Sequence, residues 1–126
     1  MPLEVVTFCL AVNMYYEARS EPLKGQVAVN QVVQNRKEDP RFPDNECDVI
    51  TQPGQFSWYW QGRDYFPLKE TESWVQAAKL ANLMATYSFQ DITDGALYYH
   101  VKTEDCNHPG KIIGSHIFSK EYYGRH

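Results

Sequence analysis

The sequence predicts an α+β domain that is mainly α-helical and has a small antiparallel sheet. Three segments place apolar residues at helical spacing, and two short β-rich runs follow them near the C-terminus. The chain has 126 residues, of which 43% are hydrophobic and 22% charged. These values are ordinary for one globular domain that buries a core. We therefore expect residues 1–126 to form a single catalytic or binding domain.

The first helix is predicted over Leu3–Ala18. Its apolar positions share one face, which Val5, Cys9 and Val12 widen, and Glu17 ends the series Val6, Leu10, Met14, Glu17. A carboxylate at the end of an apolar stripe is unusual, because the helix dipole disfavours negative charge at the C-terminal end. Glu17 is therefore a candidate catalytic acid, although a surface carboxylate paired with Arg19 or Lys24 fits the periodicity too.

Two more helices and two strands complete the predicted elements. A second helix should begin at Ser20-Glu21-Pro22, capped by Ser20 or Glu21, and end near Lys37. A third should run from about Thr71 to Ser88 and bury Trp74, Ala77, Ala78, Ala81, Met84 and Ala85. The interval from Glu38 to Leu68 is predicted to be irregular. Strands are expected at Ala96–Val101 and, as one second strand, at Ile112-Ile113 with His116–Phe118.

Charge and composition exclude several partners. The net charge is −4, the pI is near 5.5, and no basic stripe is present, so nucleic acid is not expected. No run approaches the ~20 apolar residues of a membrane span, and the N-terminus lacks the pattern of a signal peptide. We expect a monomer that is not exported by the usual route, or a trimmed domain.

The three cysteines give no disulfide framework. Cys9 lies in the apolar pattern of the first helix and is expected to be a buried thiol. Cys47 and Cys106 lie in segments without periodicity and could pair outside a reducing compartment. Whether they do so is left open.

Four short segments together resemble one enzyme family. Tyr16-Glu17-Ala18-Arg19-Ser20-Glu21 resembles the Tyr-x-Glu-Ala-Arg-Gly-Glu signature of the SleB-type cell-wall hydrolases, the spore cortex-lytic family. The other matching segments follow in the family's order: Gly25–Val29 with Asn35-Arg36, then Val49-Ile50 with Gln52–Ser57, and finally Ala96–His100 with Gly114–Phe118. The one departure in the first signature is Ser20, where the family has Gly.

The resemblance implies a lysozyme-like fold, similar to goose-type lysozymes and lytic transglycosylases. It implies cleavage of the bond between N-acetylmuramic acid and N-acetylglucosamine in peptidoglycan, with Glu17 as acid and base. Closure of a 1,6-anhydro ring by the muramic acid 6-hydroxyl would need no second carboxylate. We expect no cofactor and no metal, and peptidoglycan glycan strands as the partner. The protein is expected to be made in the cytoplasm and released to the cell wall, as in phage lysis, or to be a trimmed secreted domain.

Further site residues follow from the matched segments. Arg19 and Glu21 are expected to support the site, as an ion pair that fixes the turn between the first two helices. Substrate contacts are predicted for Gln55, Phe56, Ser57, Tyr98, Tyr99, His100 and His116. Because Tyr98 and Tyr99 alternate on a strand, one should face the core and the other the cleft.

Other chemistries remain possible at this point. A hydrolytic muramidase would use water in place of the 6-hydroxyl. His100, Cys106, His108 and His116 lie close in sequence, with Glu104 and Asp105 among them, so a zinc-dependent wall amidase or peptidase is an alternative. Two further alternatives are a cysteine hydrolase that uses Cys106 or Cys47 and a glycan-binding domain without activity.

Overall fold

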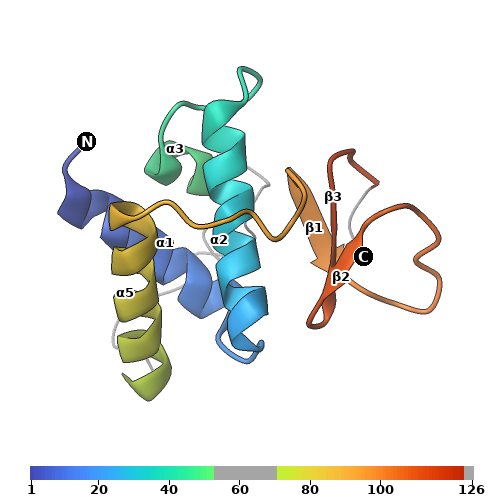
Figure 1. Cartoon of the computed structure of the whole chain (residues 1–126), viewed down its shortest axis with the longest axis horizontal. Coiled ribbons are helices and arrows are strands. Elements are labelled where there is room, and N and C mark those ends of the chain that lie inside the picture. The colour runs from blue at the N-terminus through green and yellow to red at the C-terminus, as the bar shows by residue number, and fades with distance from the viewer. Residues whose placement is uncertain (53–70, 124–126) are drawn as a thin grey trace.

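The computed structural model describes residues 1–52 and 71–123. Three long helices form most of it: α1 (Leu3–Ala18), α2 (Leu23–Glu38) and α5 (Thr71–Thr86). A short helix, α3 (Glu46–Ile50), follows α2. In Figure 1 the sheet lies beside α2, on the other side of that helix from α5. The predicted fold class, mainly helical with a small antiparallel sheet, is confirmed.

The helix bounds correct three details of the prediction. α2 begins after Pro22, which occupies the N-cap position without a side-chain hydrogen bond, so neither Ser20 nor Glu21 caps it. α5 ends at Thr86, two residues before the expected Ser88. α3 was not predicted at all. Asn45 caps α3 by accepting a hydrogen bond from the backbone N–H of Asp48 at 2.9 Å.

The helical core lies where α1 packs against α5, α2 and α3. Leu10 and Met14 of α1 are fully buried, as the periodicity predicts, whereas Val5 is 43% exposed near the helix start. On α5, Ala77, Ala81 and Met84 are buried together with Leu80, and Trp74, Ala78 and Ala85 are partly buried against the core.

A buried polar pair joins α1 to α2. The side-chain amide of Asn13 donates to Asn30 Oδ1 at 3.0 Å, and the amide of Asn30 donates to the Leu10 carbonyl at 3.1 Å. Both asparagines have no exposed surface. Buried amides are costly unless they are hydrogen-bonded, so this pair specifies one alignment of the two helices.

The sheet has three antiparallel strands in the order β1-β3-β2. β1 covers Tyr98–Val101, β2 covers Lys111–Ile113 and β3 covers His116–Ser119. The expected single second strand is therefore two strands, because Gly114 (φ 59°) turns the chain between them. The first strand starts at Tyr98, not at Ala96.

One face of the sheet packs on the helices. Phe118 and Ile113 join the buried cluster formed by Ala18 of α1 and by Ala28, Val29 and Val32 of α2, and Tyr99 packs against it. Since neighbouring strand residues point to opposite faces, Tyr98 and His100 lie on the other face.

The structure corrects the expectation for Cys9 and answers the open question about Cys47 and Cys106. Cys9 is bonded to Cys47, with their Cα atoms 5.5 Å apart, and Cys106 is a free thiol. Cys9 is therefore not a buried thiol, and Cys47 and Cys106 do not pair. The disulfide ties α1 to α3.

Within the described ranges, no helix is long and apolar enough to cross a membrane.

Candidate active site

Glu17 lies on the last turn of α1, half-buried, and meets the sheet there. The hydroxyl of Tyr99 on β1 donates a short hydrogen bond to Glu17 Oε1. The two residues are 82 positions apart in sequence. The fold therefore brings together the predicted acid and one of the two predicted tyrosines.

Tyr99 is held by aromatic neighbours on β3. Its ring centroid is 5.3 Å from that of Phe118 and 5.2 Å from that of His116, which meets it edge-on at 90°. His116 is only 8% exposed. Burial lowers the pKa of His116, and the nearby Glu21 carboxylate only partly offsets this effect. A neutral imidazole therefore packs behind the tyrosine.

Glu21 binds the turn between β2 and β3. Its Oε1 accepts the backbone N–H of Ser115 at 2.8 Å, and its Oε2 accepts the Ser115 hydroxyl at 2.5 Å. His116 Nδ1 lies 3.5 Å from Oε1, an electrostatic contact without good hydrogen-bond geometry. Burial alone would raise the pKa of Glu21, but the bonds from Ser115 and the contact with His116 outweigh it, so the pKa is lowered.

Comparison with known proteins identifies the chain's family. A family model described as cell wall hydrolase matches residues 20–119. The chain belongs to the cell wall hydrolase family. The matched stretch starts three positions after Glu17 and includes Glu21, Tyr99 and His116.

Sequence relatives narrow the type within the cell wall hydrolases. The chain is 39% identical to a spore cortex-lytic enzyme of Halalkalibacterium halodurans, over 86% of this chain and 33% of that protein. It is 36% identical to a spore cortex-lytic enzyme of Bacillus subtilis, over 86% of this chain and 35% of that protein. The chain thus spans about a third of the length of these relatives.

Solved structures agree with this type. The catalytic domain of the Bacillus cereus SleB protein matches with a TM-score of 0.68 and 36% identity, covering 92% of this chain and 91% of that one. The catalytic domain of the germination-specific lytic transglycosylase SleB from Bacillus anthracis matches with a TM-score of 0.65 and 34% identity, covering 90% and 93%. These matches confirm the SleB-type resemblance and the lysozyme-like fold class.

The remaining predicted residues of this cell wall hydrolase are placed differently from expectation. Arg19 donates to the Tyr15 carbonyl at 3.2 Å and lies 4.8 Å over the Tyr15 ring. The expected ion pair between the described residues Arg19 and Glu21 is not present, and Ser115 donates to both Glu21 oxygens. Gly114 and Ser115 were matched as a motif, yet their contact with Glu21 was missed, since a motif names no partner.

Tyr98 and His100 point away from the Glu17 side of β1. Tyr98 packs edge-on against Phe42 and Tyr122, with ring centroids 6.2 Å and 5.5 Å away. His100 meets His108, with their Nε2 atoms 2.8 Å apart. Strand alternation thus puts Tyr99 on the carboxylate side. The predicted contacts Gln55, Phe56 and Ser57 lie outside the described residues.

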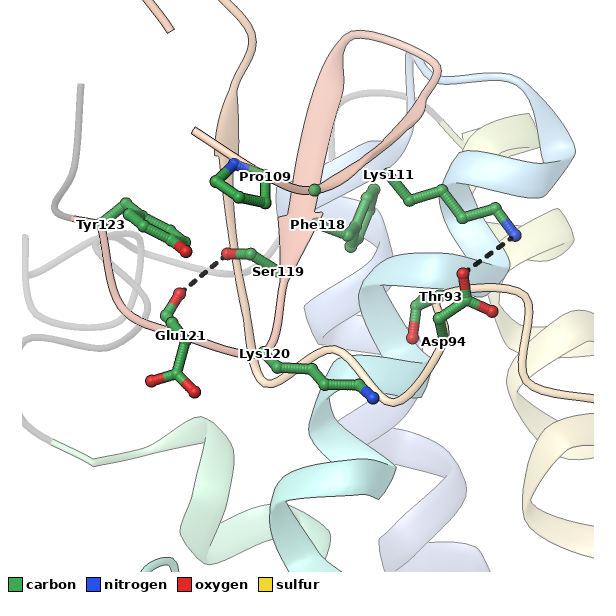
Figure 2. Close-up of a pocket in the computed structure, with 10 residues that line it drawn as sticks. Thr93, Asp94, Pro109, Lys111, Phe118, Ser119, Lys120, Glu121 and Tyr123 are labelled. Atoms are coloured by element: carbon green, nitrogen blue, oxygen red, sulfur yellow. Dashed lines mark hydrogen bonds and ion pairs between the residues drawn. The ribbon is translucent and has the colours of Figure 1, made fainter. Parts of the chain in front are cut away.

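A hollow of about 580 Å³ lies elsewhere, beside β3. Figure 2 shows its lining, where Lys111 Nζ is 3.9 Å from Asp94 Oδ2 and the Ser119 hydroxyl donates to the Glu121 carbonyl at 2.9 Å. Neither Glu17 nor Tyr99 lines it. We assign no catalytic role to this hollow, because its Asp94–Lys111 pair is exposed to solvent.

Proposed function

We propose that this cell wall hydrolase degrades peptidoglycan by cutting the bond between N-acetylmuramic acid and N-acetylglucosamine, with Glu17 as acid and base. The observation that carries the proposal is the hydrogen bond from Tyr99 to Glu17 Oε1. The relatives support the substrate, because their names describe cortex-lytic enzymes and, in one case, a lytic transglycosylase.

The tyrosine orients the acid. Tyr99 donates to Oε1, so a proton carried by Glu17 belongs on Oε2. In the first step Glu17 gives this proton to the glycosidic oxygen as the bond to muramic acid C1 breaks. In the second step the Glu17 carboxylate removes the proton of the 6-hydroxyl while that oxygen bonds to C1. A 1,6-anhydro product forms, Glu17 ends protonated, and no water is consumed.

A single-carboxyl route is supported by the state of Glu21. Retaining glycosidases place a second carboxylate about 5–5.5 Å from the acid as nucleophile. Glu21 is the other acid of the matched signature, but Ser115 occupies both of its oxygens. Its role in the proposal is to hold the turn before His116, which packs on Tyr99.

The proposal places the work of the chain at the cell wall, on glycan strands, with residues 1–126 acting as a catalytic module. Nothing in this mechanism needs a second copy, so we expect a monomer. Size-exclusion chromatography with light scattering measures this. A dimer that dissociates without loss of activity would leave the mechanism intact and correct only the oligomeric state.

The test is mass spectrometry of the soluble products from purified peptidoglycan. Fragments ending in 1,6-anhydromuramic acid are expected from the wild type, and Glu17→Gln should release none while keeping the wild-type circular dichroism. Glu4→Gln, a change near the start of the same helix, is the matched control and should cut normally. Reducing muramic acid ends would mean a hydrolytic muramidase. Released peptides with intact glycan, or no products at all, would refute the proposal.

A further inference from the structure

The free thiol and two histidines meet on the sheet face opposite Tyr99. His100 comes from β1, and Cys106 and His108 come from the connection of residues 102–110. One nitrogen or sulfur atom from each lies within 4.8 Å of the others. His100 is 8% exposed, and the other two are half-buried. Glycan cleavage by Glu17 uses none of them.

The hydrogen bonds of the two imidazoles leave the Nε2 atoms of His100 and His108 facing each other as acceptors. His100 Nδ1 is 3.0 Å from the Val101 carbonyl, and His108 Nδ1 is 2.9 Å from the Pro109 carbonyl. A carbonyl only accepts, so both Nδ1 atoms carry the ring hydrogen. In neutral rings both Nε2 atoms then present lone pairs, and these atoms are 2.8 Å apart. Two facing lone pairs at this distance suit a bound cation.

Cys106 provides the third ligand. Its Sγ lies 3.8 Å from His100 Nδ1, so the thiol side chain turns toward Nε2 to reach the ion. The backbone N–H of Thr103 donates to Sγ at 3.4 Å. The His108 ring is stacked on Tyr123, with centroids 4.1 Å apart and planes at 7°, which fixes the ring's orientation. Backbone carbonyls that hold the Nδ1 hydrogens of ligating histidines are the usual outer contacts of a zinc site.

We propose that His100 Nε2, His108 Nε2 and Cys106 Sγ bind a zinc ion, with water at the fourth position. Zinc takes imidazole nitrogen at about 2.0–2.1 Å and thiolate at about 2.3 Å in tetrahedral geometry. Two such nitrogens stand about 3.3 Å apart, so small ring movements admit the ion. The ion ties the 102–110 connection to β1. Strand alternation separates it from Glu17, so it stabilises the fold and takes no part in glycan cleavage.

The first measurement uses chelator-treated wild-type protein and cobalt as a spectroscopic probe. We expect saturation at one cobalt per chain, a near-ultraviolet thiolate-to-cobalt charge-transfer band, and displacement by zinc. Cys9 and Cys47 are joined in the disulfide, so within the described chain only Cys106 can give this band. Absence of saturable binding would overturn the proposal.

Variants then locate the ion. Cys106→Ser should abolish the charge-transfer band, and His108→Ala should weaken zinc binding by more than about tenfold. Glu104→Gln, in the same connection but outside the cluster, should bind like the wild type. Equal binding by Cys106→Ser would refute the assignment. Because the wild-type titration needs no variant, misfolding of a variant leaves the proposal testable.

Two further readouts separate this site from catalysis. Zinc should raise the Tm of the chelator-treated protein by several degrees, and Cys106→Ser should lose that rise. The zinc-free protein should still release anhydro fragments at a temperature where it is folded. A failure of Glu17 chemistry with normal cobalt binding would count against the proposed function alone. Activity lost without zinc and restored by it would make the ion catalytic and contradict the structural role.

Discussion

Removing the disulfide between α1 and α3 should cost this domain a large part of its stability. The bond joins Cys9 to Cys47 across a sequence separation of 38 and encloses the whole of α2. The chain-entropy relation for a loop of this size gives about 3.9 kcal/mol at 25 °C. Domains typically have only about 5–15 kcal/mol of net stability. Cys9→Ser with Cys47→Ser should therefore unfold at much lower denaturant, while the core contacts stay the same.

Equilibrium unfolding in urea, followed by circular dichroism, measures this difference. The wild type in dithiothreitol should match the double serine variant, and dithiothreitol should not change that variant further. Alkylation of the unfolded, unreduced wild type followed by mass spectrometry should label Cys106 and leave Cys9 and Cys47 unmodified. If the bond is present in the wild type but the double serine variant loses less than about 1 kcal/mol of unfolding free energy, the reasoning is refuted. The unfolded chain would then already hold these segments together.

Three other changes test the site. Tyr99→Phe removes the hydrogen bond to Glu17, worth about 1.5–3 kcal/mol, so release of soluble glycan should slow about 10- to 150-fold in a folded protein; an unchanged rate would remove the orienting role. Gly114→Ala should cost about 2–4 kcal/mol in a thermal melt, because φ is 59° and the new Cβ would clash with Glu21 Oε1; a wild-type melt would contradict the turn. Folding lowers the pKa of His116 from its ordinary 6.5, so the unfolded chain binds the proton first as pH falls. The contribution of His116 to the free energy of unfolding should therefore be constant above pH 6.5 and decrease below it. Urea unfolding measured at a series of pH values should show a smaller loss of stability at low pH for His116→Gln.

Helical periodicity predicted the three long helices, although only α5 buries a single face, while α2 and the second half of α1 are buried on several sides. Leu10 and Met14 are fully buried where the pattern places them. The same reasoning missed α3, since five residues give no repeat to read. It also placed the cap of α2 on Ser20 or Glu21, but Glu21 is drawn away to bind Ser115. Competing tertiary contacts decide such details, and a local pattern does not contain them.

The site shows the same limit. A carboxylate on an apolar helix face made Glu17 a candidate acid, but its partner Tyr99 is 82 positions away, and only the packed sheet selects it over Tyr98. Cys9 was read as a buried thiol because its helical position was apolar, and its bond to Cys47 depends on α3, which sequence did not reveal. Pairings across long separations need the fold itself.

The buried amides of Asn13 and Asn30 have a consequence for the accuracy of the acid's placement. Asn13 precedes Glu17 by four residues, about one helical turn, so the two share a side of α1. If α1 slid along α2 by one turn, about 5.4 Å, both amides would lose their partners in a dry interior. The amide pair therefore fixes the position of α1 along α2, and with it how far α1 extends toward the sheet. In the proposed mechanism, the reach of Glu17 toward a sugar would therefore be set inside the core, by two residues outside the candidate site.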